Sequence, residues 1–234
     1  MHIAVILAGG SGFRFGNDIP KQFLKVNNKT ILEYCIEAFE YHSLIDGIIL
    51  VIKNDYISLT KEIILQNGYK KIKHIVPGGK ERYESSVSAI EACENDDDIL
   101  LFHDCARPLV DERIISDCIA AMSRYNAVTV AVNTSDTIYI SSSDGRITSI
   151  PCRSTLRNAQ TPQCFRLSTI RSAYSNAFRD TSFQPTDDCS VVFRYLPDEP
   201  IYIVEGDSSN IKITYKEDLI LMSQILNKKV KKCY

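Results

Sequence analysis

The chain of 234 residues lacks the features of several common protein classes. Its net charge of −2 leaves no basic excess of the kind that binds nucleic acid. No apolar stretch approaches the roughly 20 residues that a membrane-spanning helix needs, and the first apolar run is too short for a secretory signal peptide. Internal repeats and low-complexity tracts are also missing. We therefore expect a cytoplasmic protein that binds neither nucleic acid nor membranes.

Disulfide patterns are equally scarce, although the chain has eight cysteines. The cysteines are scattered, no Cys-x-x-Cys pair occurs, and a chain of this length folds without covalent cross-links. Four of them lie among apolar residues and are predicted to be small buried thiols: Cys35, Cys93, Cys118 and Cys164. This distribution indicates a reduced protein.

The glycine-rich segment near the N-terminus contains neither of the two best-known phosphate-binding motifs. A dinucleotide fingerprint requires Gly-x-Gly-x-x-Gly, but Gly10 and Gly12 are followed by Gly16, one residue too late. The Gly-Lys-Ser/Thr of a P-loop is absent. An ordinary turn between a strand and a helix, with solvated basic residues, is one interpretation of this segment.

The same segment also fits another kind of phosphate site. Residues 3–7 form an uncharged apolar run typical of a buried strand. The glycines that follow let backbone N–H groups approach an anion closely, and Arg14 and Lys21 bring two cations to the loop. This combination predicts a nucleoside triphosphate site.

Apolar and amphipathic segments alternate along the chain. Segments typical of strands cover residues 3–7, 47–52, 73–76, 98–102, 127–132 and 201–204. Segments typical of helices cover residues 30–41, 58–67, 84–94, 111–125, 168–178 and 216–226. The alternation predicts a single α/β domain, residues 1–234, built from βαβ units around a parallel, three-layer sheet.

Residues 134–152 depart from this alternation. Residues 137–140 and 146–150 flank a turn of serine, aspartate and glycine, which is typical of a β-hairpin. A hairpin that leaves a parallel sheet has unpaired edges, and exchange between two subunits is one way to cover them. We therefore expect a protruding β-arm that forms a homodimer.

A second glycine segment occupies residues 78–86, between a predicted strand and a predicted helix. Its glycines again allow close backbone approach, and Arg82 and Ser85 could reach a base or a ribose. The alternative is a simple helix start, with Glu84 and Ser85 in its first turn.

An aspartate follows the apolar run 98–102, where open α/β sheets bind their ligands. Asp104 could hold Mg²⁺ through one carboxylate while a triphosphate supplies further oxygens. A salt bridge between Asp104 and Arg107 is the structural alternative. His103 is expected to be packed rather than catalytic. Cys105 is not expected to act as a nucleophile, because the sequence indicates no base beside it.

Three later segments, residues 153–163, 186–188 and 210–214, mix cations or hydroxyls with turn-forming residues. Arginine suits planar, bidentate recognition of phosphate. Asp187 and Asp188 have an alternative role as helix caps.

Taken in order, these motifs resemble one family, the cytidylyltransferases that act on 2-C-methyl-D-erythritol 4-phosphate and on ribitol 5-phosphate. The resemblance runs from residue 3 to about residue 226. It rests on Ile6-Leu-Ala-Gly-Gly-Ser-Gly-x-Arg14, Pro20-Lys21-Gln22, Gly78-Gly79-x-x-Arg82, His103-Asp104-x-Ala106-Arg107-Pro108, Asp136-Thr137, Gln160-Thr161-Pro162-Gln163, Thr186-Asp187-Asp188 and Asn210-x-Lys212-x-Thr214.

The resemblance implies a Rossmann-like nucleotidyltransferase sheet and Mg²⁺-dependent transfer of CMP from CTP to a polyol phosphate, with release of pyrophosphate. It assigns catalysis to Arg14, Lys21, Arg153 and Lys212, and Mg²⁺ to Asp104. It assigns CTP binding to Leu7, Ala8, Gly9, Gly10, Gly12, Gly79, Arg82, Ser85, Asp104 and Cys105. It assigns the polyol phosphate to Arg107, Thr137, Arg153, Thr161, Thr186 and Lys212, with Thr137 and Arg153 reaching a neighbouring subunit.

Different motifs of the chain point to two different acceptors. Ala106-Arg107-Pro108 and Thr186-Asp187-Asp188 resemble the methylerythritol enzymes, whereas Arg157, Ser209 and Ile150-Pro151-x-Arg153 resemble the ribitol enzymes. We favour 2-C-methyl-D-erythritol 4-phosphate, with ribitol 5-phosphate as the alternative. A sugar-1-phosphate nucleotidyltransferase and an inactive nucleotide-binding protein are alternatives of other classes.

Overall fold

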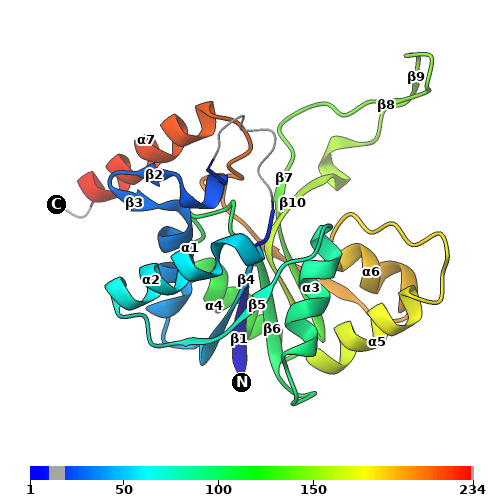
Figure 1. Ribbon diagram of the computed structural model, residues 1–234. Helices are drawn as coiled ribbons and strands as arrows, with labels where there is room; N and C mark the ends of the chain where they lie inside the picture. The colour runs from blue at the N-terminus through cyan, green and yellow to red at the C-terminus, as the bar shows by residue number, and fades with distance from the viewer. Residues whose placement is uncertain (11–18, 233–234) are drawn as a thin grey trace.

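A seven-stranded sheet forms the centre of the computed structural model, which describes residues 1–10 and 19–232 (Figure 1). The strand order is β11-β7-β10-β6-β1-β4-β5. The strands are β1 (His2–Ala8), β4 (Gly47–Ile52), β5 (Ile72–Pro77), β6 (Ile99–Asp104), β7 (Ala127–Asn133), β10 (Arg157–Arg166) and β11 (Ile201–Glu205). The first strand of the chain thus lies inside the sheet, with β4 on one side and β6 on the other.

Helices cover both faces of this sheet, which gives the three layers expected (Figure 1). One layer contains α1 (Ile31–Glu40), α2 (Ile57–Asn67), α4 (Glu112–Ala121) and α7 (Glu217–Lys232). The other contains α3 (Arg82–Glu91), α5 (Leu167–Ala177) and α6 (Asp188–Tyr195). Short elements complete the fold: β2 (Lys25–Val26), β3 (Lys29–Thr30), and the 3-10 turns η2 (Lys21–Phe23), η3 (Asn54–Tyr56) and η4 (Arg153–Thr155).

Two hydrophobic cores follow from the alternation of side chains along each strand. In β1, Ala4 and Ile6 pack into the core beneath α1 and α4, whereas Ile3 and Val5 pack into the core beneath α3 and α5. A strand buried on both faces has an unbroken apolar sequence, as residues 3–7 do. The four cysteines predicted to be core thiols are buried: Cys35, Cys93, Cys118 and Cys164.

The prediction of a parallel sheet is wrong for one strand. Strand β10 lies between β6 and β7 and is antiparallel to both, while the other pairings in this sheet are parallel. The sequence pattern does not reveal this strand because its middle, Gln160 to Gln163, is polar and contains Pro162. The register of β10 against β7 shifts at that point, which accommodates a proline without an N–H to donate.

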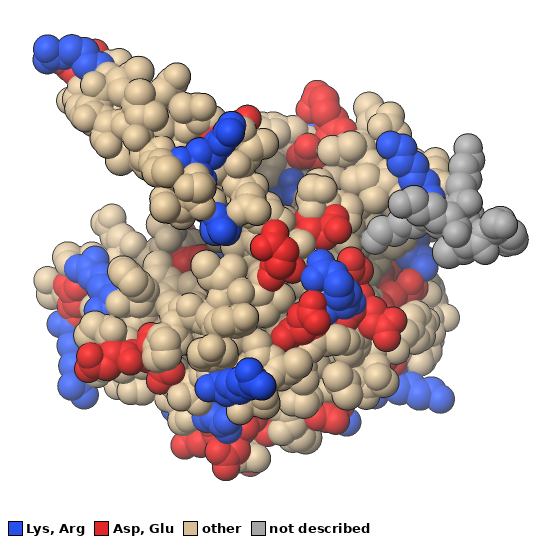
Figure 2. All heavy atoms as spheres, turned by 180° about the vertical axis from the view of Figure 1, so that it is seen from behind, with Lys and Arg blue, Asp and Glu red and all other residues tan. Residues whose placement is uncertain are grey.

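The predicted β-arm is present. Residues 134–156 leave the sheet between β7 and β10 and project away from it (Figure 1). At the tip, β8 (Ile140–Ser141) pairs antiparallel with β9 (Ile147–Ser149) across a turn that contains Gly145 at a φ of 84°. Along its length the arm is largely free of charged side chains (Figure 2). Its exposed apolar side chains are Ile138, Tyr139, Ile140, Ile147 and Ile150.

Candidate active site

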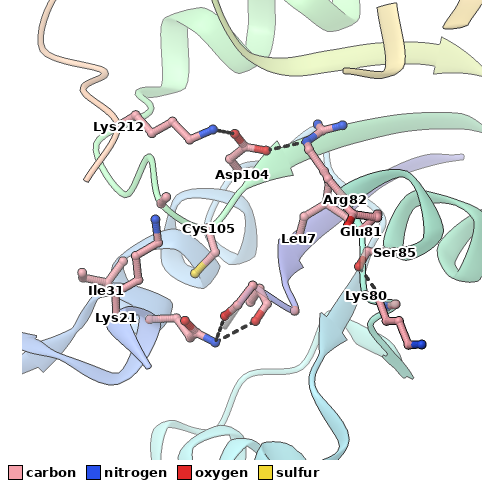
Figure 3. A pocket seen from close by; sticks show the side chains of 16 residues that line it. Leu7, Lys21, Ile31, Lys80, Glu81, Arg82, Ser85, Asp104, Cys105 and Lys212 are labelled. Carbon is pink, nitrogen blue, oxygen red and sulfur yellow. Dashed lines mark hydrogen bonds and ion pairs between the residues drawn. The ribbon is translucent and has the colours of Figure 1, made fainter. Parts of the chain in front are cut away.

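A pocket of about 280 Å³ lies at the ends of β1 and β6, on the edge of the sheet where open α/β folds bind ligands (Figure 3). Most of its lining comes from the end of β1, the start of α3 with the residues just before it, and the end of β6, and η2 and the loop after β11 add further side chains. Its lining residues include Leu7, Ala8, Gly9, Gly10, Lys21, Gln22, Gly79, Arg82, Ser85, Asp104, Cys105 and Lys212. The pocket therefore gathers both predicted glycine segments and the predicted carboxylate in one place.

The two glycine segments touch through their backbones. A Cβ built on Gly78 would lie 2.9 Å from the Cα of Gly9, and one built on Gly9 would lie 3.2 Å from the Cα of Gly78. At position 78 a side chain would therefore force the two backbones to shift, whereas glycine fits. Ser85 Oγ accepts a hydrogen bond from the N–H of Gly79 at 3.1 Å, and Gln22 Nε2 donates to the carbonyl of Ala8 at 2.8 Å. These side chains fix both segments in position.

Three charged side chains of the pocket, Lys212, Asp104 and Arg82, form a network (Figure 3), which continues outside the pocket to Asp188. Lys212 Nζ donates to one oxygen of Asp104 at 2.7 Å, and Arg82 Nε donates to the other at 3.1 Å. Arg82 also donates through Nη1 to Asp188 at 2.6 Å. The alternative in which Arg107 pairs with Asp104 is not observed, because the guanidinium of Arg107 donates to the carbonyls of Asn210 and Ala159.

Asp104 is ionised in this environment. Burial would raise the pKa of its carboxyl, but the charges of Arg82 and Lys212 outweigh burial and hold that pKa well below its ordinary value. His103 is the reverse case, because burial lowers its pKa to about 4 and keeps the ring neutral. The ring lies between the carbonyl of Arg107 and the hydroxyl of Thr161, so it is packed, as expected.

The loop after β11 carries Lys212 into the pocket. Asn210 is fully buried and donates to Gln160 Oε1 and to the carbonyl of Thr161, which fastens the loop to β10. The backbone of Ile213 then bridges the site, since its N–H donates to the carbonyl of Ala106 and its carbonyl accepts from Lys21 Nζ at 2.9 Å. Lys21 and Lys212 therefore enter the pocket from two chain segments that are tied together.

Comparison with known proteins identifies this arrangement. The profile of one family, described as IspD, 2-C-methyl-D-erythritol 4-phosphate cytidylyltransferase, matches residues 2–228. The chain belongs to the IspD family. It is accordingly a nucleotidyltransferase of the cytidylyltransferase type.

Individual relatives support the IspD assignment over nearly the whole chain. A 2-C-methyl-D-erythritol 4-phosphate cytidylyltransferase of Thermobifida fusca is 44% identical over 229 residues, covering 95% of this chain and 92% of the relative. The crystal structure of a 4-diphosphocytidyl-2C-methyl-D-erythritol synthase from Anaerococcus prevotii superimposes with a TM-score of 0.86 at 30% identity, covering 97% of this chain and 96% of the other.

A relative named for a different activity is also similar to this IspD chain. The bifunctional ribulose 5-phosphate reductase/CDP-ribitol pyrophosphorylase Bcs1 of Haemophilus influenzae is 39% identical over 227 residues. The match covers 96% of this chain and 48% of that longer protein.

Several residues assigned to the IspD site lie outside the pocket within one chain. Thr161 is buried beneath the pocket, where its hydroxyl accepts from the N–H of Asp104 at 3.2 Å. Thr186 lies beside the pocket, near Arg82 and Asp187, in a smaller cavity of about 150 Å³. Asp187 caps α6 by accepting from the N–H of Ser190, which confirms the capping alternative for that residue.

The remaining assignments concern the arm and the glycine loop. Arg153 lies at the base of the arm and donates to the carbonyl of Ser135 at 3.3 Å, and Thr137 is exposed on the arm. Neither residue meets the pocket of its own chain. Gly12 and Arg14 lie outside the described residues.

The donor set of the pocket fits a magnesium ion that arrives with a nucleotide. Among residues 1–10 and 19–232, no group of three or more histidine, cysteine, aspartate or glutamate side chains forms a metal site. Mg²⁺ is commonly held by one or two carboxylates together with substrate phosphates, and the ionised Asp104 supplies one carboxylate.

Among residues 1–10 and 19–232, none of the helices has the length and the apolar composition needed to cross a bilayer.

Proposed function

We propose that the chain transfers CMP from CTP to 2-C-methyl-D-erythritol 4-phosphate, releasing pyrophosphate. The names of the Thermobifida fusca and Anaerococcus prevotii relatives support this acceptor. The observation that carries the proposal is the meeting of Lys21, Lys212 and Asp104 at a glycine-lined pocket. Such a pocket suits a polyanion and a metal ion together.

The reaction needs no covalent intermediate on the protein. An oxygen of the acceptor phosphate forms a bond to the α-phosphorus of CTP, and the bond from that phosphorus to the bridging oxygen of pyrophosphate breaks. The main obstacle is that two anions must meet. Lys21 and Lys212 offset their repulsion, Arg14 is proposed to join them, and binding in one pocket makes the step effectively unimolecular.

Asp104 is the residue that would hold Mg²⁺. When bound, the ion would neutralise phosphate charge and polarise the phosphoryl oxygens. Because Lys212 pairs with one oxygen of Asp104, a cation held by that carboxylate would compete with the lysine for it. Lys212, about half exposed, then has room to turn its ammonium group to a phosphate.

The test is a pyrophosphate-release assay with CTP, Mg²⁺ and a panel of polyol phosphates. Product is expected from 2-C-methyl-D-erythritol 4-phosphate and CTP, and little from ATP, GTP or UTP. Release with sugar 1-phosphates alone would contradict the proposal. CTP binding without turnover on any acceptor would indicate a nucleotide-binding protein instead.

Ribitol 5-phosphate is the second candidate acceptor, because Bcs1 carries CDP-ribitol pyrophosphorylase in its name and the chain shares features with ribitol enzymes at Arg157 and Ser209. The same assay separates the two. Turnover of ribitol 5-phosphate and none of methylerythritol phosphate would reverse the choice of acceptor and leave the reaction class unchanged.

We also propose that the arm forms a homodimer. Five large apolar side chains on it are 41–59% exposed, and exposed apolar groups concentrated in one segment mark an interaction surface. A partner's arm would bring Thr137 and Arg153 to a pocket that they do not reach in their own chain. The acceptor phosphate would then be bound between two subunits.

Adding charge to the arm is expected to separate the subunits. In the double variant Ile140→Asp and Ile147→Asp, two carboxylates would have to be buried without partners, so a monomer is expected in sedimentation velocity at micromolar concentration. Ser143→Asp, which adds a carboxylate in the polar turn, serves as the control. A double variant that sediments like the wild type would contradict dimerisation through the arm.

A further inference from the structure

Asp188, the first residue of α6, is a fully buried carboxylate to which the proposed reaction gives no role. Oδ2 accepts from Arg82 Nη1 at 2.6 Å, and Oδ1 accepts from the hydroxyl of Tyr174 at 2.7 Å. Its backbone N–H donates to Gln163 Oε1. The side chain is absent from the pocket lining, so its route to the pocket runs through Arg82.

The guanidinium of Arg82 is shared between two carboxylates. Nη1 binds Asp188, Nε binds Asp104 at the longer distance of 3.1 Å, and Nη2 has no protein partner among the described residues. The group lies on the wall of the pocket beside Asp104 (Figure 3). A short bond to an immobile, buried carboxylate fixes the plane of a long side chain that would otherwise rotate.

This sharing limits what Arg82 does to Asp104. A guanidinium facing a single carboxylate prefers a bidentate pair, with two parallel N–H groups on two oxygens. Here the contact is monodentate, from Nε to one oxygen of Asp104, while Lys212 Nζ binds the other oxygen. Asp188 holds Nη1 and so sets the orientation of the guanidinium, and the second oxygen of Asp104 keeps Lys212, a half-exposed partner that a ligand can replace.

We propose that Asp188 is a positioning residue of the nucleotide site. It holds Arg82 so that one edge of the guanidinium faces the bound nucleoside triphosphate and Asp104 stays able to change partners. Tyr174 supports the same function by fixing the second oxygen of Asp188. This inference rests on the proposed function, because the nucleoside triphosphate is the ligand concerned.

Calorimetric titration with CTP, below the unfolding temperature of every variant, tests the proposal. Asp188→Asn removes the charge and keeps the size of the side chain, and the Kd for CTP is expected to rise roughly tenfold, as loss of a charge-assisted contact predicts. Tyr174→Phe is expected to raise it about twofold to threefold, because Asp188 loses one support and keeps its charge.

Asp98→Asn is the matched control. Asp98 is also a buried carboxylate, it pairs with the N-terminal amine at 2.8 Å, and it precedes β6, whereas Asp104 ends that strand. Its loss should lower the melting temperature and leave the Kd for CTP within twofold of the wild type. An equal loss of CTP affinity in both Asp→Asn variants would reduce the effect to general destabilisation and overturn the proposal.

A double-mutant cycle shows whether Asp188 acts through Arg82. In an Arg82→Met background, Asp188→Asn should cause no further change in CTP affinity, since the connecting group is gone. It should also raise the melting temperature of Arg82→Met, because a buried carboxylate that has lost its cationic partner is removed. A further tenfold loss in that background would overturn the proposal.

The outcomes separate this inference from the proposed function. No CTP binding by the wild type would reject the function. Normal binding by the wild type and unchanged binding by Asp188→Asn would reject only the role of Asp188. If Asp188→Asn does not fold, Tyr174→Phe decides, and wild-type CTP affinity in that variant overturns the proposal.

Discussion

Replacing Lys21 by alanine is expected to lower kcat by roughly 10²–10³, the usual effect of removing one well-placed donor to developing charge. Lys21 lines the pocket and is held by the carbonyl of Ile213. Its ammonium group is therefore already positioned when the two anionic reactants arrive. The measurement is steady-state pyrophosphate release with saturating CTP and acceptor.

Lys53→Ala is the control for Lys21→Ala, because Lys53 is exposed, pairs with Asp55 at 3.5 Å and lies outside the pocket. It should keep wild-type kcat. Both variants should melt close to the wild type, since the loss of one partly exposed lysine costs little stability. Normal turnover by folded Lys21→Ala would remove this lysine from the mechanism.

Asp104→Asn is expected to lower kcat/KM for CTP by about 10² or more, because one side chain both positions two cations and offers the carboxylate proposed to hold Mg²⁺. Asparagine keeps the shape and loses the charge. The Mg²⁺ concentration for half-maximal rate should rise along with the loss of activity. An unchanged magnesium dependence would place the ion elsewhere.

The same variant has a stability signature that depends on pH. The folded-state pKa of Asp104 is depressed below the ordinary 3.8, so its ionisation stabilises the fold above that value, and this contribution fades as the pH falls toward the lower, folded-state pKa. The gap in unfolding free energy between wild type and Asp104→Asn should therefore be full at pH 7 and smaller at pH 3. Urea denaturation at both pH values measures it, and a constant gap would contradict the ion pairs with Arg82 and Lys212.

The sequence alone predicts those parts of the fold that depend on local patterns. Strands β1 and β4 are apolar on both faces and have the composition of buried strands. The helices in the N-terminal half of the chain have clear amphipathic spacing. Strand β10 escapes prediction because it is long, polar in the middle and antiparallel, so it matches neither pattern. Boundaries differ by a few residues as well, since His103 and Asp104 end β6 rather than follow it.

The features of the site also separate into those that local motifs predict and those that only the fold reveals. Motif spacing predicts the glycine segments and Asp104 at one edge of the sheet, because the ends of neighbouring strands meet there. The partners of each charge depend on tertiary packing. Lys212 and Asp104 are 108 residues apart, and Arg82 and Asp188 are 106 apart. The sequence therefore indicates Asp104 as a metal ligand, but its ion pairs with Arg82 and Lys212 are visible only in the fold.

The contact between Gly9 and Gly78 sets how closely the two glycine segments approach each other. A Cβ on Gly78 would lie only 2.9 Å from the Cα of Gly9, so an alanine at position 78 would push the two main-chain segments apart. The separation of the two main-chain segments at this side of the nucleotide pocket is thus set by contact between their backbones. Engineering of base or acceptor preference therefore has to proceed through the charged side chains that line the pocket, while position 78 remains glycine.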